Sequence, residues 1–169
     1  MPVQLRPLTA ADAEAHCAGE DELIVRWLTG GYGSIEGTTA HFAQLAHNAA
    51  AGIGKRGYGV WVDDRLGGYV DFDPDLDDGL EADEVNVSYC VHPWARGRGV
   101  AEEAVRLVCD VLRRDRIGSR AAIRADPENA ASVRVAEKAG FRFAGTFVSG
   151  TDRHPDGTPA TLSLHLLDL

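Results

Sequence analysis

Cysteine is scarce in this chain and poorly spaced for a disulfide framework or a zinc site. The 169 residues include three cysteines, Cys17, Cys90 and Cys109, an odd number without a Cys-x-x-Cys pair. Small disulfide-stabilised domains have an even and denser set, and a structural zinc ion needs four closely spaced ligands. The cysteine content therefore favours a reducing cytoplasm and gives no reason to expect a bound metal.

Long apolar runs are also missing. No stretch of the sequence approaches the roughly 20 apolar residues that a membrane-spanning helix needs. The first residues, MPVQLRPLTAADAEAHC, have neither the basic start nor the apolar segment of a secretory signal peptide. We therefore expect a cytoplasmic protein with no membrane partner. Its length predicts a single domain over residues 1–169 that is large enough to bury a core.

Positive charge is in deficit. Lys and Arg together number 17 and Asp and Glu number 26, which gives a formal net charge of -9. A protein that binds duplex nucleic acid needs a basic face, so we expect no nucleic-acid partner. The negative balance permits a cationic partner without requiring one.

The apolar pattern alternates between strand and helix along the chain. Apolar residues at every second position predict strands, and a spacing of three to four predicts helices. Strands are expected over residues 3–8, 60–62, 66–72, 85–91, 120–125, 141–150 and 160–169. Helices are expected over residues 10–28 with a break near Gly19, and over 34–51, 100–114 and 129–140.

The sequence HPWARGRGVAEEA, residues 92–104, places Arg96, Gly97, Arg98 and Gly99 directly before a predicted helix. Glycine weakens a helix start unless the backbone must turn sharply or something must approach closely, and arginine there opposes the helix dipole. An anion at the helix N-terminus accounts for both, because the dipole and free N–H groups attract phosphate. A tight turn with solvated arginines is the alternative.

Two common phosphate-binding motifs do not fit this stretch. The dinucleotide fingerprint GxGxxG needs a third glycine, where this chain has Glu102. A Walker loop needs Ser or Thr after its lysine, but in the nearest match, AAGIGKRG, Lys55 is followed by Arg56. Neither nucleotide-binding class is therefore expected.

A third pattern does fit. Arg96-x-x-Gly99-x-Ala101, after a strand that ends in Val91-x-Pro93, resembles the acetyl-CoA signature of the GNAT superfamily of N-acetyltransferases. NAASVRVAEKAGF, residues 129–141, resembles the segment of that family in which an asparagine starts a helix ending in Lys-x-Gly-Phe. The order of elements agrees over nearly the whole chain. The motifs are most similar to those of the Rim-type protein N-terminal acetyltransferases and their small-molecule relatives.

The resemblance implies the GNAT fold, an α/β (α+β) arrangement with a mixed, mostly antiparallel sheet of about seven strands and about four helices. The sheet should be splayed beside the signature strand, where acetyl-CoA enters as co-substrate without a metal. The implied reaction is direct acetyl transfer to a primary amine, either a protein N-terminus or a small cationic antibiotic or metabolite. Monomer and homodimer both stay open. The competing interpretation is a non-catalytic CoA-binding or calcium-binding module.

The resemblance also implies which residues bind acetyl-CoA. The signature strand should pair with the pantetheine arm, and one of its backbone N–H groups should hold the thioester carbonyl. The N–H groups of the glycine–arginine turn should bind the pyrophosphate, and Asn129 should touch the pantetheine arm as well as cap its helix. The implied contacts are Tyr89, Cys90, Val91, Arg96, Gly97, Arg98, Gly99, Val100, Ala101, Glu102 and Asn129.

The proton donor departs from the common family pattern. Many members carry a tyrosine four residues after the position of Ser132, and here that position is Ala136. Ser132 is then the best remaining hydroxyl near the sulfur, as in the Rim-type pattern. A serine with no role on the helix surface is the alternative, because a proton donor must lie within hydrogen-bond reach of the sulfur.

The proton acceptor departs as well. The positions that correspond to the catalytic carboxylate of relatives are Asn86 and Arg124, and neither side chain is a base. An attacking amine must first lose a proton, because a primary amine is largely protonated at neutral pH. We expect Glu84 to take that proton through water that passes Asn86 and Ser88. Further candidates are Asp71, Asp83 and His92.

An acidic segment, DFDPDLDDGLEADE, runs from Asp71 to Glu84. Its spacing approaches that of a calcium loop, but its glycine comes one position late and a strand precedes it. We expect a solvated loop, or an acidic lip that attracts a cationic amine together with residues 20–22. Cys90 is expected to be structural rather than a nucleophile, and His41 and His47 are expected to be surface groups.

Overall fold

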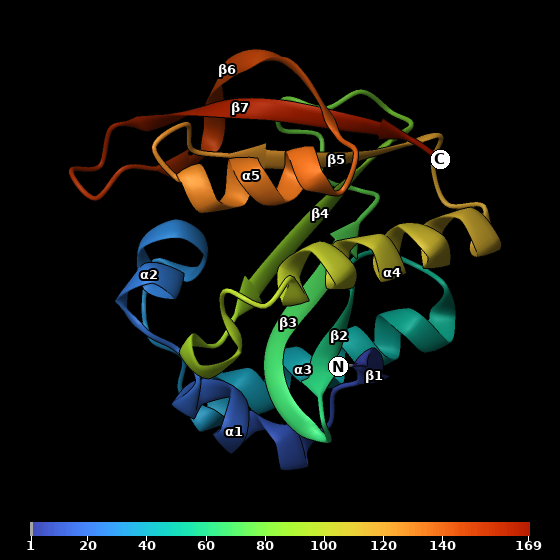
Figure 1. Cartoon of the computed structure of the whole chain (residues 1–169), viewed down its shortest axis with the longest axis vertical. Coiled ribbons are helices and arrows are strands. Elements are labelled where there is room, and N and C mark those ends of the chain that lie inside the picture. Colours follow the sequence, from blue (N-terminus) through green and yellow to red (C-terminus); the bar gives the residue numbers. More distant parts are fainter. Residues whose placement is uncertain (1) are drawn as a thin grey trace.

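Seven strands form one mixed sheet in the computed structural model, which describes residues 2–169, in the order β1-β2-β3-β4-β5-β7-β6 (Figure 1). The strands are β1 Val3–Pro7, β2 Arg56–Val62, β3 Arg65–Asp73, β4 Glu84–Val91, β5 Arg120–Ala125, β6 Arg142–Arg153 and β7 Pro159–Asp168. The α-helices are α1 Ala13–Ala18, α2 Glu22–Ile24, α3 Ile35–Ala51, α4 Val100–Asp115 and α5 Ala130–Lys138. Shorter turns of helix are η1 Ala10–Asp12, η2 Val25–Thr29 and η3 Pro93–Ala95.

The sheet is antiparallel except between β4 and β5, and these two strands separate after a short contact. Their parallel pairing covers only Glu84–Asn86 of β4 and Arg120–Ala122 of β5. Beyond it, β4 remains paired with β3 and β5 with β7. The predicted mixed sheet, splayed at the signature strand, is confirmed.

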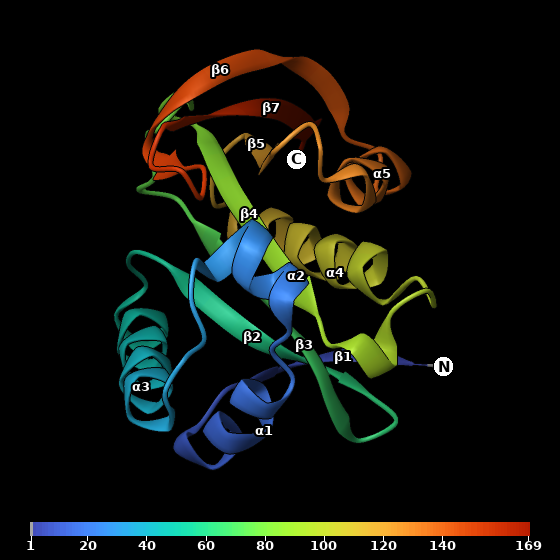
Figure 2. The same ribbon diagram turned by 90° about the vertical axis from the view of Figure 1, so that its left-hand side faces the viewer.

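Helices cover both faces of the sheet, and each face has its own apolar core. On one face the stripe predicted for α4, which includes Val100, Val108 and Leu112, packs in a cluster with Phe72 and Val87 of the sheet. On the other face, side chains of α1 and α3 form a second cluster with β3 and β4. Figure 2 shows α3 and α4 on opposite sides of β2 and β3. Removing this apolar surface from water is the main stabilising contribution.

The N-terminal helical region is divided more finely than the sequence predicts. The expected break at Gly19 is present, and α2 begins three residues later at Glu22, after Asp21, whose side chain accepts the N–H of Ile24. The last turn, η2, is a π-helix that ends at Gly30 in the left-handed conformation. Figure 2 shows α2 in front of β4, between strands β1, β2 and β3 below and strands β5, β6 and β7 above.

Two strands are longer than expected. β2 begins at Arg56, where pairing with Phe72 of β3 starts, and β6 extends to Arg153, which pairs with Pro159 across the final hairpin. Backbone hydrogen bonds to the neighbouring strand extend β2 and β6 into these residues, although their side chains do not alternate between apolar and polar. Between the strands predicted over residues 60–62 and 66–72 the chain turns at Asp63 and Asp64, which both have positive φ. Within residues 2–169, no helix is long and apolar enough to cross a membrane.

Candidate active site

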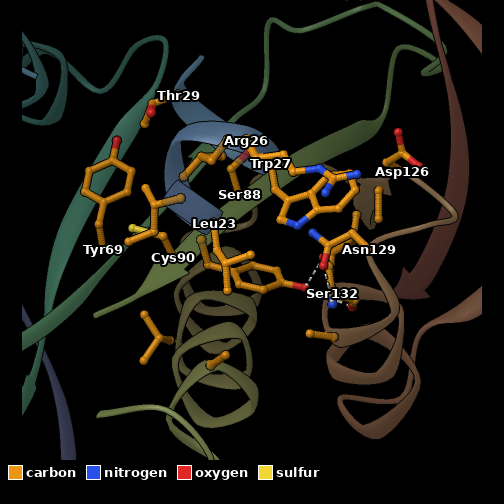
Figure 3. A pocket seen from close by; sticks show the side chains of 18 of the residues that line it. Leu23, Arg26, Trp27, Thr29, Tyr69, Ser88, Cys90, Asp126, Asn129 and Ser132 are labelled. Carbon is orange, nitrogen blue, oxygen red and sulfur yellow. Dashed lines mark hydrogen bonds between the residues drawn. The ribbon is translucent and has the colours of Figure 1, made fainter. Parts of the chain in front are cut away.

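A long open cleft follows the line along which β4 and β5 separate. Its volume is about 1530 Å³, which is more than the roughly 300–1,000 Å³ of a pocket for one small ligand. The cleft therefore has room for two substrates. Figure 3 shows Tyr69 on one side of this space and Ser132 on the other, with Ser88 and Cys90 between them.

The free edge of β4 forms one wall of the cleft. From Val87 to Val91, β4 has no strand partner on the β5 side anywhere in the described chain. Arg124 of β5 lies near the start of the gap, where its Nε donates to Oδ1 of Asn86 at 3.2 Å. An unpaired strand edge can accept an extended ligand with amide groups as an added strand. Tyr89, Cys90 and Val91 all line the cleft here, as the predicted contacts require.

The turn before α4 exposes a run of backbone N–H groups to the cleft. Gly97 and Gly99 have φ of 72° and 73°, a conformation that other residues rarely adopt. From Gly97 onward, the first N–H that finds a backbone acceptor within residues 2–169 is that of Glu103, which donates to the carbonyl of Gly99 at 3.1 Å. The preceding N–H groups, at the positive end of a 16-residue helix, form a site for a phosphate group. The predicted contacts Gly97, Gly99, Val100, Ala101 and Glu102 line the cleft at this point.

The two arginines of this turn have different surroundings, and of the two only Arg96 lines the cleft. The Arg96 guanidinium makes two hydrogen bonds to the Asp21 carboxylate, at 2.5 and 2.8 Å, and its Nε donates to the carbonyl of Val91 at 3.0 Å. Those bonds hold the pKa of Asp21 at about 2. Arg96 thus ties α2 to the end of β4 instead of presenting a free charge. Arg98 is exposed and lies outside the cleft lining.

Positive charge reaches the cleft from α5 instead. Arg134 and Lys138 both line it, and neither forms an ion pair with another residue that the structure describes. Our reading of the sequence missed them. Their spacing of four on a helix places them on one face and was the available signal.

Ser132 of α5 faces Tyr89 of β4. The two hydroxyl oxygens are 2.8 Å apart, and the Tyr89 hydroxyl also donates to the Ser132 carbonyl at 3.1 Å. Burial raises the pKa of Tyr89 to about 12, so this hydroxyl keeps its proton at neutral pH. Asn129 caps α5 by accepting the N–H of Ser132 at 3.3 Å, and both residues line the cleft.

Glu84 lies where β4 and β5 are still paired, and it does not line the cleft. Its side chain is buried, lies 3.1 Å from Arg120, and accepts the N–H of Glu81 at 3.0 Å. These contacts remove the reason for expecting it to deprotonate the acceptor. His92, a second candidate, is also buried outside the cleft, and burial lowers its pKa to about 4. Asp83 is exposed outside the cleft as well, which leaves Asp71 as the sequence candidate that lines it.

The acidic segment is anchored rather than uniformly solvated. Asp78 accepts hydrogen bonds from Arg124 at 2.7 Å, from the Ser149 hydroxyl at 2.5 Å and from the N–H of Gly150 at 2.8 Å. Asp75 and Asp77 are exposed and do not line the cleft. Among the residues described, no three potential ligands of His, Cys, Asp or Glu type gather as a metal site would need. The expected acidic lip is therefore smaller than the sequence suggested.

Two of the three carboxylates at residues 20–22 also make structural contacts. Glu20 accepts the N–H of Gly33 at 2.7 Å, and Asp21 is paired with Arg96. Glu22 is exposed and lies outside the cleft lining. Of residues 20–22, Glu20 alone faces the cleft.

Comparison with known proteins gives one family. Residues 3–142 match the family described as the acetyltransferase (GNAT) domain, which is most of the chain. A search of curated proteins by sequence found no match.

Several solved structures share the fold. RimL, a ribosomal L7/L12 alpha-N-protein acetyltransferase in complex with coenzyme A, has a TM-score of 0.84 and 15% identity, with 99% of this chain and 94% of that chain covered. RimJ from Mycobacterium smegmatis has a TM-score of 0.83 and 20% identity, with 98% and 81% covered. The aminoglycoside acetyltransferase AAC(6')-Ib in complex with coenzyme A has a TM-score of 0.76 and 20% identity, with 99% and 95% covered.

Proposed function

Because the chain belongs to the GNAT acetyltransferase family, we propose that it transfers the acetyl group of acetyl-CoA directly to a primary amine of a cationic acceptor. Family membership makes acetyl-CoA the acetyl donor and the chain an acyltransferase. The observation that carries the proposal is the junction of the free β4 edge with the N-terminus of α4 in one cleft. A phosphate site beside an unpaired strand edge suits a long ligand with a pyrophosphate at one end and amides along its arm.

The donor binds along this junction. The N–H groups between Gly97 and Glu102 hold the pyrophosphate, and Arg134 and Lys138 supply positive charge from α5. The free backbone of Tyr89–Val91 pairs with the pantetheine arm, and Asn129 contacts the same arm. A backbone N–H of β4 then holds the thioester oxygen and stabilises the negative charge that develops there.

The chemistry is one displacement at the thioester carbonyl. The amine nitrogen attacks the carbonyl carbon, a C–N bond forms, and the C–S bond breaks with its electron pair on sulfur. The Ser132 hydroxyl, backed by the Tyr89 hydroxyl at 2.8 Å, donates the proton that the sulfur takes up. Holding both reactants in one cleft supplies much of the rate, because it removes the entropy cost of their encounter.

The acceptor is a cationic amine, and two classes fit. Protein N-termini and aminoglycosides are the substrates that the names of RimL and of AAC(6')-Ib give for those proteins. Support for a cation comes from Asp71 and Asp73, which line the acceptor side of β3, and from the formal net charge of -9.

The compartment is part of the same proposal. We place the reaction in the cytoplasm, where thiols stay reduced. In support, Cys17, Cys90 and Cys109 are free, and burial raises the pKa of Cys90 to about 12. Cys90 is thus an unreactive buried thiol, which suits direct transfer without a covalent enzyme intermediate.

An amine panel tests the proposal. The protein is incubated with acetyl-CoA and with amidated peptides that start with different residues, with kanamycin or with spermidine, and the free thiol and the product mass are measured. Each peptide has a matched control whose N-terminus is already acetylated. We expect thiol release and a gain of one acetyl group with at least one cationic amine, and none with its blocked form. Failure of every amine to accept acetyl would contradict the proposal.

A further inference from the structure

The hydroxyl of Tyr69 lies between a carboxylate and an imidazole on the acceptor side of the cleft. It donates to Oδ2 of Asp71 at 2.7 Å, and Nε2 of His41 lies 3.2 Å from the same hydroxyl oxygen. A phenol has one proton, which Tyr69 gives to Asp71, so the His41 contact requires a hydrogen on Nε2. This arrangement fixes the tautomer of His41 and leaves the lone pair of Nδ1 free.

The three side chains come from two elements and differ sharply in exposure. Asp71 and Tyr69 of β3 are 3% and 7% exposed, whereas His41 of α3 is exposed, and all three line the cleft. Oδ1 of Asp71 is buried and has no hydrogen-bond partner in the described residues. Burying a carboxylate with an unpaired oxygen is unfavourable, so its presence in a cleft indicates a function.

We propose that His41 is the general base that deprotonates the acceptor amine, and that Tyr69 and Asp71 are positioning residues that hold its ring and stabilise its protonated form. This inference rests on the proposed acetyl transfer. The sequence predicts that His41 is a surface group, and it is exposed, but on the wall of the cleft. Asp71, a sequence candidate for the base itself, acts here through Tyr69.

The register of the sheet places Tyr69 and Asp71 one strand away from the proposed reaction site. Tyr69 pairs with Cys90 and Asp71 pairs with Ser88 across the β3–β4 ladder, and the opposite edge of β4 is the free one, where we place the thioester. The positions of the base in relatives are occupied by Asn86 and Arg124, which bond to each other. In Figure 3 Tyr69 lies at the end of the view opposite Ser132. The base and the acid thus approach the amine and the sulfur from opposite sides.

The surroundings keep His41 neutral and able to accept a proton. Partial burial of its ring against Tyr69 lowers the pKa of His41, although the residue as a whole is exposed; the Lys55 ammonium lowers this pKa further, and the Asp71 carboxylate opposes both. The other charged or titratable groups that face the trio are Asp73 of β3, which acts on Asp71 and Tyr69, Cys90 of β4, which acts on Tyr69, and His16 of α1. Lys55 is 3.6 Å from Oδ2 of Asp71, so the carboxylate has a counter-charge before His41 is protonated. A neutral imidazole at pH 7 is the form that general-base catalysis requires.

The protons balance over one turnover. The acceptor ammonium gives one proton to Nδ1 of His41, directly or through one water, and the neutral amine attacks. After the C–N bond forms, the nitrogen loses its second proton by the same route, and His41 releases each to solvent. The sulfur takes one proton from the Ser132–Tyr89 pair, which regains one from solvent. One ammonium and one thioester thus give one amide, one thiol and one released proton.

Kinetics of four variants test the inference, with the best amine of the panel as acceptor. His41→Gln keeps a donor for Tyr69 but no base, and should lower kcat at pH 7 about 100-fold, because a general base contributes roughly 10²–10⁴. The acetyl-CoA KM should not change. The difference in kcat between His41→Gln and the wild type should shrink as the pH approaches the pKa of the acceptor amine, because the amine then loses its proton without a base. Tyr69→Phe and Asp71→Asn should each lower kcat about tenfold, which is less than the effect of His41→Gln, because the base itself remains. His47→Gln, an exposed histidine of the same helix outside the cleft lining, is the matched control and should equal the wild type.

A structural measurement separates this inference from the proposed function. Imidazole nitrogen shifts of the free protein, assigned with His41→Gln, should show hydrogen on Nε2 and a protonation midpoint below 6.5. Tyr69→Phe should abolish the preference for that tautomer. If no amine in the panel is acetylated, the proposed function fails, and the nitrogen shifts still decide the arrangement. If the wild type acetylates an amine and His41→Gln keeps its kcat and pH profile, or if Nδ1 carries the hydrogen, this inference is overturned.

Discussion

The hydroxyl oxygens of Tyr89 and Ser132 lie 2.8 Å apart across the gap where β4 and β5 separate. One comes from the signature strand and the other from α5, so the pair joins the two sides of the cleft. The position where many relatives carry a tyrosine is Ala136, which is fully buried here. A phenol therefore does reach Ser132, but it comes from β4.

Removing either hydroxyl tests whether the pair acts as one proton donor. Ser132→Ala and Tyr89→Phe should each lower kcat about tenfold and leave the acetyl-CoA affinity nearly intact. The double variant should lower kcat only slightly more than the more damaging single variant does, because the effects of groups that act as a unit are not additive. Thiol release under saturating substrates measures kcat, and calorimetry measures affinity. Unchanged kinetics in both single variants at every pH would assign the pair to structure.

The phosphate site at α4 can be tested with two glycines of the same conformation. Gly99→Asp places a carboxylate at the helix N-terminus where we propose that the pyrophosphate binds, and should weaken acetyl-CoA binding tenfold or more, about 1.4 kcal/mol. Gly52→Asp is the control, because Gly52 has φ of 69° and equally open surroundings at the end of α3, outside the cleft. Calorimetric titration with acetyl-CoA measures both. Equal affinity in the two variants would exclude the pyrophosphate from this helix.

The Asp21–Arg96 pair should stabilise the fold in a pH-dependent way. Arg96 holds the pKa of Asp21 at about 2, below its ordinary 3.8, so the unfolded chain takes up the proton first as the pH falls. The stabilisation is complete above about pH 4 and is lost between about pH 4 and pH 2. Asp21→Asn can still cap α2 and should lower the free energy of unfolding by about 1 kcal/mol at pH 7, since solvent screens a partly exposed pair. Urea unfolding at pH 7 and pH 3 should show this difference shrinking, and a constant difference would contradict the assignment.

Much of the fold follows from local patterns, whereas the contacts of the site do not. The apolar stripe of α4 and the alternation in β4 are repeated along each element, so the sequence displays them directly. The Asn129 cap is also local, because its partner is the N–H of Ser132 three residues later.

The partners of the charged residues could not be predicted in this way. Arg96 bonds to Asp21 across 75 residues, and Arg124 bonds to Asp78 across 46. Whether an arginine meets a phosphate or a carboxylate depends on which loops the sheet order brings together. His41 and Tyr69 are 28 residues apart on different elements, so no spacing in the sequence indicates their contact.

The acidic segment contains two kinds of carboxylate, and neutralising them should affect the stability of the fold to different extents. Asp78 and Arg124 have side chains that are 12% and 10% exposed, so Asp78→Asn leaves a nearly buried guanidinium with weaker partners. That variant should lower the free energy of unfolding by about 2 kcal/mol, which is less than the roughly 3–5 kcal/mol lost when one member of a fully buried pair is removed, because asparagine still offers an acceptor oxygen. Asp75→Asn with Asp77→Asn removes two exposed charges and should change stability by less than about 0.5 kcal/mol.

The exposed pair should instead affect capture of the acceptor. Charges act over roughly 10 Å at 0.1 M salt, so the double variant should raise the KM of a cationic acceptor at low salt and lose this effect at high salt. The acetyl-CoA KM should stay the same, because the site proposed for its phosphates is at α4. Asp63→Asn with Asp64→Asn removes the same charge from the β2–β3 turn and is the matched control. If both double variants raise the acceptor KM equally, the segment contributes only net charge, and if neither does, the acceptor is not drawn in by Asp75 and Asp77.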